Sequence, residues 1–216
     1  MKKGCWIIAA VLAFAVCAHD AAWAGPELSG FGGYQFGGQI PTSIGEVDFK
    51  DNATYGLALE VPMSMKPGSS LLLWYNRMDT DIRLNTGWEK VTLGSAALNY
   101  FQAGGLYNVD RGTPVVPFTL VTLGATWMDP SSSARYQGGG GYTFDDVTKF
   151  SFMLGGGVKY WTSERLAVRI QFNLAMTFIN SGAYMGVGTG GASISVGGSG
   201  FAQGAILGGL TLKLGQ

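Results

Sequence analysis

The sequence predicts an all-β protein, an eight-stranded antiparallel up-and-down transmembrane β-barrel. Hydrophobic residues make up 47% of the chain and charged residues only 13%, which is little charge for a soluble domain. Beyond the first two dozen residues, however, no apolar run reaches the roughly 18 residues that a membrane-spanning helix needs. Apolar residues instead alternate with polar or small ones. Glycine, at 35 of 216 positions, further disfavours helices and suits curved sheets.

Residues 1–24 have the pattern of a cleaved signal peptide. Two lysines near the start precede an apolar run over 6–16, and Ala22-Trp23-Ala24 supplies small residues at the spacing that signal peptidase recognises. Cleavage at this point leaves residues 25–216 as one outer-membrane barrel domain. There are two alternatives. One is a membrane anchor, which is disfavoured because the apolar run is shorter than the roughly 20 residues of a span. The other is a lipid anchor on Cys17.

Removal of this segment takes away the residue types on which many enzyme sites depend. Both cysteines, Cys5 and Cys17, and the single histidine, His19, lie within it. The mature chain then has no thiol nucleophile, no histidine base and no disulfide, and a metal site would need carboxylates alone. We therefore expect no catalytic residue, no cofactor, no metal and no enzyme activity. With 12 basic and 13 acidic residues left, nothing favours a nucleic-acid partner.

The clearest strand covers 165–178, where apolar residues occupy every second position without a break. This length exceeds most strands of soluble sheets and suits a tilted crossing of the hydrocarbon layer, which takes about 9–11 residues plus its rims. The same alternation, with interruptions, occurs in seven further segments. The eight expected strands are 28–39, 53–65, 69–79, 91–107, 113–128, 148–161, 165–178 and 200–214.

The expected connections alternate between short and long. Short turns follow the second, fourth and sixth strands at Lys66-Pro67-Gly68, Asp110-Arg111-Gly112 and Thr162-Ser163-Glu164. Loops of roughly 10 to 20 residues follow the first, third, fifth and seventh strands. Outer-membrane barrels have short periplasmic turns and longer extracellular loops. We therefore expect both chain termini in the periplasm.

Aromatic residues near the strand ends are expected to form a girdle at each membrane boundary, where ring side chains prefer to lie. Aromatic residues also favour strands in general, which is the less specific explanation. The strand directions assign Phe36, Tyr55, Trp127, Phe150 and Phe178 to the outer girdle, and Tyr107, Tyr160 and Trp161 to the inner girdle.

Polar residues on the other face of the strands are expected to form a network in the lumen. Buried charges must pair or reach water, so we expect an ion pair between Glu60 and Arg169, with Lys159, Arg165 and Lys213 in water near the periplasmic mouth. A structural polar core is favoured over a conduit or gate, because side chains can fill a barrel of eight strands. The expected lumen network comprises Glu60, Lys159, Arg165, Arg169, Gln171, Asn173 and Lys213.

Residues 28–214 resemble the small outer-membrane barrel families typified by OmpW, OmpX and the membrane domain of OmpA. The signal pattern, the eight strands and the segment Thr113-Pro114-Val115-Val116-Pro117-Phe118, which looks like the Pro-aromatic strand start of this group, carry the resemblance. It implies a location in the outer membrane of a Gram-negative bacterium, with lipid, lipopolysaccharide and the barrel assembly machinery as partners. The chain departs from the group at its end, where Leu214-Gly215-Gln216 stands in place of the aromatic residue that this machinery reads.

Three functions follow as hypotheses. The first is a non-enzymatic barrel that stabilises the envelope or contacts the surroundings through its outer loops. The second, implied by the resemblance to OmpW, is a carrier or narrow channel for small hydrophobic molecules, with Phe31, Trp74 or Leu123 lining an apolar upper lumen. The third is a secreted soluble barrel that holds a ligand, like a lipocalin, which requires apolar residues inside and charge outside.

Overall fold

The computed structural model describes residues 25–42, 45–64, 66–85, 90–130, 147–178, 183–188, 191–196 and 200–215. The expected signal peptide, residues 1–24, lies outside this part. No helix in these ranges is long and apolar enough to cross a membrane. The strands are β1 (Glu27–Gln35), β2 (Gln39–Thr42), β3 (Gly45–Phe49), β4 (Asn52–Pro62), β5 (Ser69–Asn85), β6 (Lys90–Asn108), β7 (Val115–Pro130), β8 (Val147–Trp161), β9 (Leu166–Phe178), β10 (Ala183–Gly188), β11 (Gly191–Val196) and β12 (Gly200–Lys213).

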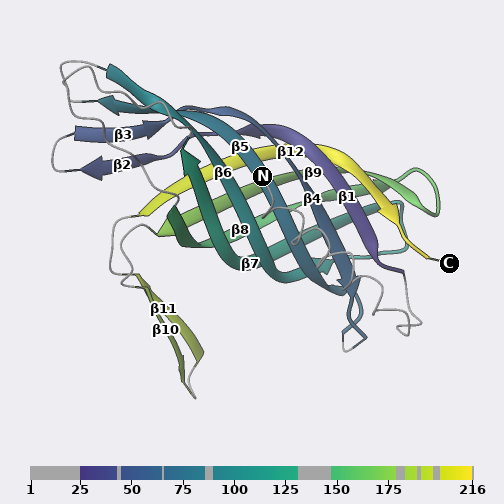
Figure 1. The fold of residues 1–216 in the computed structure, drawn as a ribbon. Coiled ribbons are helices and arrows are strands. Elements are labelled where there is room, and N and C mark those ends of the chain that lie inside the picture. Colours follow the sequence, from purple (N-terminus) through teal and green to yellow (C-terminus); the bar gives the residue numbers. More distant parts are fainter. Residues whose placement is uncertain are drawn as a thin grey trace, which may run out of the picture.

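Eight of these strands close into a barrel, as predicted (Figure 1). Around the barrel they run β1, β4, β5, β6, β7, β8, β9 and β12, and every neighbouring pair is antiparallel. The last strand pairs with the first from Glu27↔Lys213 to Gln35↔Ala205, which closes the sheet. The backbone hydrogen bonds of the barrel strands are thereby satisfied without an open edge, the condition for crossing a bilayer.

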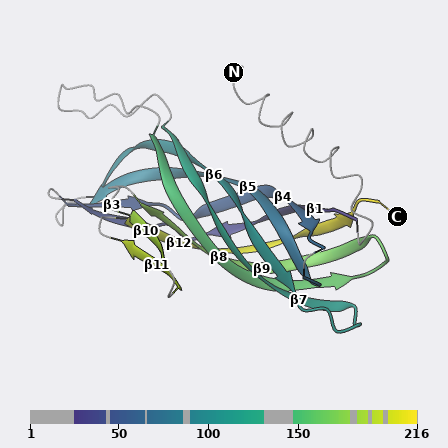
Figure 2. The same ribbon diagram turned by 90° about the horizontal axis from the view of Figure 1, so that it is seen from below.

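The short turns lie where the sequence places them, but one predicted long loop is wrong. Strands β5 and β6 continue past the expected ends, so that only residues 86–89 separate Asn85 from Lys90. The β2–β3 hairpin, within the first long connection, pairs with the outer part of β5. It lies at the barrel end opposite the C-terminus (Figure 1 and Figure 2). Strands β10 and β11 pair with each other within the last long connection.

The two faces of the barrel wall differ in polarity. Along β9, Arg169, Gln171 and Asn173 are buried in the lumen, whereas Ile170 and Phe172 on the outer face are 62% and 52% exposed. A lipocalin-like soluble barrel requires the reverse arrangement. That alternative is wrong for this chain, because its outer wall is apolar and its interior holds the charges.

Glycines make room for the largest rings inside the barrel. Phe31 on β1 stacks on Trp74 of β5, with ring centroids 4.0 Å apart. A Cβ atom at Gly56 on β4 would lie 2.8 Å from Cζ of Phe31, and one at Gly209 on β12 would lie 2.8 Å from its Cβ. Strands β4 and β12 therefore pack their backbones against Phe31, because each has a glycine beside it.

This packing predicts opposite outcomes for two glycine substitutions. A methyl group at Gly56 would also lie 2.1 Å from the carbonyl oxygen of Tyr75, so Gly56→Ala should destabilise the barrel by about 1–3 kcal/mol or more. Gly208→Ala is the matched control, because nothing lies within 4 Å of its Cβ position. It should leave stability unchanged or slightly raised. Urea titration of the chain refolded in lipid vesicles measures both, and equal losses would contradict the packing described.

Candidate functional site

The centre of the lumen polar network is an ion cluster formed by Glu27, Glu60, Lys159 and Arg169. Glu60 is 1% exposed and accepts from two cations. Nη1 of Arg169 donates to its Oε1, and Nζ of Lys159 donates to its Oε2 at 2.6 Å. Lys159 Nζ also donates to Oε2 of Glu27 at 2.6 Å. Two positive and two negative charges thus meet across four strands, which gives each buried charge a partner.

The predicted network residues lie at different depths along the barrel axis, and not all of these depths match the expectation. Glu60 and Arg169 meet as expected. The expectation that Lys159 stays in water is wrong: it is 1% exposed, because it lies one inward position inside the end of β8 and two carboxylates offset its charge. Arg165 is exposed on the turn before β9, and Lys213 is partly buried at the barrel end. Sequence reasoning missed Glu27, although it shares the inward parity of Ser29 and Phe31.

Arg169 is held by rings and amides as well as by charge. Its guanidinium lies 4.3 Å from the ring centroid of Phe118 and 6.0 Å from that of Trp74, distances at which a cation is attracted to a ring face. Its Nε donates to Oε1 of Gln171 at 2.5 Å, and Nε2 of Gln171 donates to Oδ1 of Asn173 at 2.9 Å. The predicted residues Gln171 and Asn173 therefore extend the ion cluster toward the middle of the lumen.

A second polar group, the outer network, consists of Gln35, Asn76, Tyr100 and Gln203. Gln35 Nε2 donates to Oε1 of Gln203 at 3.0 Å, and Asn76 Nδ2 donates to Oε1 of Gln35 at 3.1 Å. The Tyr100 hydroxyl also donates to Gln203. A cavity of only about 10 Å³ lies among these residues and Asn173. Because this is room for about one water molecule, the described side chains fill the middle of the lumen.

The outer end of the lumen is apolar. Phe49 of β3 stacks on Phe201 of β12, with ring centroids 5.0 Å apart, and both are buried. The hairpin that carries Phe49 thus packs onto the barrel. Phe31 and Trp74 are inside the lumen but pack against each other. The expectation that Leu123 lines the lumen is wrong, because its neighbour Thr122 takes the inward position and Leu123 is exposed outside.

The predicted girdle residues lie mostly on the outer wall. Phe150 and Phe178 stack there with ring centroids 5.8 Å apart. Trp161 is the exception, and its assignment to a girdle is wrong: it shares the inward parity of Lys159 and lines a hollow at the barrel end. The residues exposed on the outer wall are Phe36, Tyr55, Tyr107, Phe150 and Tyr160, and Trp127 and Phe178 are partly exposed.

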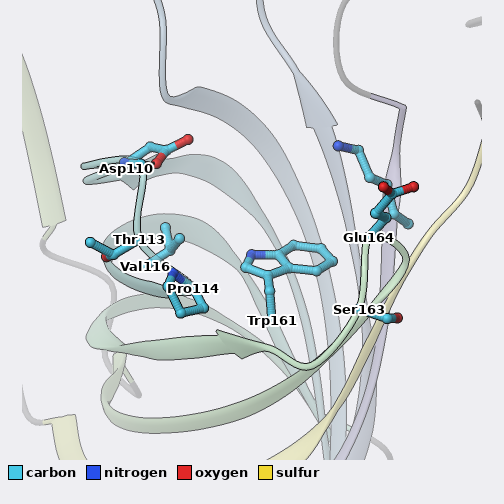
Figure 3. A pocket seen from close by; sticks show the side chains of 9 residues that line it. Asp110, Thr113, Pro114, Val116, Trp161, Ser163 and Glu164 are labelled. Carbon is cyan, nitrogen blue, oxygen red and sulfur yellow. Dashed lines mark hydrogen bonds between the residues drawn. The ribbon is translucent and has the colours of Figure 1, made fainter.

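The hollow beside Trp161, here called the vestibule, has a volume of about 310 Å³. It opens at the end of the barrel that carries the short turns (Figure 3). Within the described ranges, no group of three or more histidine, cysteine, aspartate or glutamate residues is placed to hold a metal ion. The vestibule is lined by Asp110, Gly112, Thr113, Pro114, Val116, Trp161, Ser163, Glu164 and Lys213.

Comparison with known proteins shows what this architecture is similar to. No protein-family model and no curated protein matches the chain. The crystal structure of neisserial surface protein A (NspA) aligns at 12% identity over 88% of this chain and 98% of that chain, with a TM-score of 0.56. The outer membrane protein OprG from Pseudomonas aeruginosa aligns at 13% identity over 89% of this chain and 97% of that chain, with a TM-score of 0.55.

The outer membrane protease OmpT from Escherichia coli also aligns, at 8% identity over 88% of this chain and 96% of that chain. Its TM-score of 0.43 is too low to carry an argument about chemistry. At identities this low, the similarity to NspA and OprG establishes the fold alone. The outer wall of this chain adds an independent observation, because its exposed apolar side chains suit a lipid surrounding. The chain therefore has the fold of the small bacterial outer-membrane β-barrels.

Proposed function

We propose that the protein is a non-enzymatic barrel of the bacterial outer membrane that stabilises the envelope or contacts the surroundings through its long loops. Residues 1–24 act as the signal peptide in this proposal. The short turns face the periplasm and the β2–β3 hairpin faces outside. Membrane lipid and lipopolysaccharide surround the wall between the two girdles, and the barrel assembly machinery inserts the chain. The observation that carries the proposal is the filled lumen.

The lumen is closed at successive levels along its axis. The ion cluster occupies the end nearer the short turns, the Phe31–Trp74 stack and the outer network follow, and the Phe49–Phe201 stack lies at the outer end. The cavity of about 10 Å³ among them is too small for a hydrated ion. A barrel built in this way supports a structural or surface role better than transport of ions.

A closed lumen predicts negligible ion conductance. Mature protein reconstituted in planar bilayers should give no stable channels, while an unboiled sample migrates differently from a boiled one on a detergent gel and so reports the folded barrel. Gly208→Ala, which leaves the lumen unchanged, should behave identically. Large, stable channels of nanosiemens size in the folded protein would overturn the closed-lumen proposal.

A carrier for small hydrophobic molecules is the second candidate, and the apolar outer lumen favours it. Phe49, Phe201 and Leu98 belong to the apolar cluster of the lumen, and partly buried Met128 packs against it. Because this region is already filled, a ligand must displace Phe49, the residue contributed by the hairpin. Phe49→Ala should then increase the uptake of an alkane-like fluorescent probe. A folded Phe49→Ala barrel that takes up no more probe than the parent chain excludes this route.

A further inference from the structure

Several polar groups in the vestibule have no partner among the residues that the structure describes. The Lys213 ammonium, the Glu164 carboxylate and the Trp161 indole N–H make no ion pair or hydrogen bond with any described residue. Asp110 uses one carboxylate oxygen, Oδ1, to accept the backbone N–H of Gly112 at 2.8 Å, and its other oxygen binds no group in the described part of the chain. This differs from the ion cluster deeper in the lumen, where each charged residue has a partner of opposite charge.

The charges are arranged on two sides of a flat apolar surface. Asp110 and Glu164 lie on opposite sides of the Trp161 indole (Figure 3). Lys213 belongs to the Glu164 side, because its backbone N–H donates to the carbonyl oxygen of Arg165 at 2.8 Å. Pro114 and Val116 complete the apolar lining. An unengaged acid thus stands on one side of the ring, and an unengaged base with a second acid stands on the other.

We propose that the vestibule binds a zwitterionic short peptide, with its amino group at Asp110 and its carboxylate at Lys213. Charge-assisted hydrogen bonds are among the stronger ones available to a protein, and capture of peptide termini is a known recognition mode. The peptide body lies on Trp161, whose ring offers apolar area beside a polar N–H. Glu164 is left to accept a peptide N–H. At about 310 Å³, the space is at the small end of ligand pockets and fits one or two residues.

This inference rests on the proposed orientation, which places the vestibule in the periplasm. The peptide must be free at both ends, because covalent attachment at either end removes one of the two charges that the vestibule recognises. The experiment measures binding at the vestibule alone and leaves the closed lumen and the folded barrel to be measured separately.

The test follows the indole N–H signal of Trp161 by nuclear magnetic resonance in lipid nanodiscs, with Trp161→Phe to assign the signal. Dialanine should give a saturable shift. N-acetyl-dialanine, which lacks the amine, and dialanine amide, which lacks the carboxylate, should each bind about tenfold more weakly. Asp110→Asn should abolish only the preference for the free amine, and Lys213→Gln only the preference for the free carboxylate. Arg111→Gln, on the same turn but outside the lining, is the matched control and should change neither.

Three results would overturn the proposal. The first is no shift of the Trp161 signal at dialanine concentrations up to about 10 mM. The second is equal binding of the free and blocked peptides. The third is a variant at Asp110 or Lys213 that loses binding without losing its preference for the free amine or the free carboxylate, respectively. If binding fails while the gel shift and the closed lumen persist, the proposed function stands and only this inference fails.

Discussion

Replacing Glu60 with leucine is expected to destabilise the barrel by about 3–5 kcal/mol, because it leaves two buried cations with a single carboxylate. Arg169 and Lys159 are both 1% exposed and both bind Glu60. Glu27, at the edge of the cluster, forms an ion pair with Lys159. Urea unfolding in lipid vesicles measures the loss, and a heat-shift gel reports the folded fraction if the variant refolds poorly.

Two further variants separate lost charge pairing from lost packing. Glu60→Met combined with Arg169→Met removes one charge of each sign and leaves the Lys159–Glu27 pair, so it should recover most of the stability, as neutral replacement of buried ion pairs often does. Glu164→Leu removes an exposed acid from a turn and should change stability little. A loss below about 1 kcal/mol for Glu60→Leu would mean that water reaches the cluster.

An arginine in place of Phe172 is expected to destabilise the barrel by about 2–4 kcal/mol, the range for a cation at the bilayer midplane on the lipid face of a barrel. Phe172 lies on the outer face near the middle of β9 and is 52% exposed. Leu166→Arg, at the first position of the same strand, should cost only about 0–1 kcal/mol, because the cost falls toward the interface. Phe172→Leu controls for loss of the ring.

The same three variants also test for a soluble barrel. If the outer face were in water, an exposed arginine would cost little at either position. Equal, small effects of Phe172→Arg and Leu166→Arg in vesicles would therefore contradict the lipid-facing wall. A large effect at Leu166 alone would instead place the membrane boundary elsewhere along β9.

The barrel could be predicted from the sequence because one face of each strand contacts lipid and the other faces the polar lumen. Strand β9 follows strict alternation for this reason. In β5 the alternation fails at Leu71-Leu72-Leu73, since the structure buries the apolar Leu72 in the lumen, opposite Glu60 on β4, while its neighbours are partly exposed. The extension of β5 to Asn85 also escaped prediction, because polar residues such as Asp79 and Asp81 end the membrane pattern without ending the strand.

Site prediction gave the facing direction of the predicted network residues but not their depth, and it assigned Leu123 and Trp161 to the wrong face of the wall. Alternation places Glu60, Lys159 and Arg169 in the lumen, but which of them meet depends on strand register and tilt, which one strand pattern does not contain. Lys159 was therefore expected in water. Trp161 was assigned from its place at a strand end, although its shared parity with Lys159 indicates the lumen. The vestibule escaped prediction entirely, because it joins two turns with the end of β12.

Solvent accessibility along β9 tests the orientation of the wall most directly. The expected mature chain has no cysteine, so single cysteines at 166–178 carry a spin label at one known position each. In vesicles, collisions of the spin label with oxygen, which concentrates in lipid, should be most frequent at every even position from 166 to 178. A water-soluble nickel complex should have little access to the label at these positions between the two membrane boundaries. Nickel access at the even positions, or no period of two, would contradict this account.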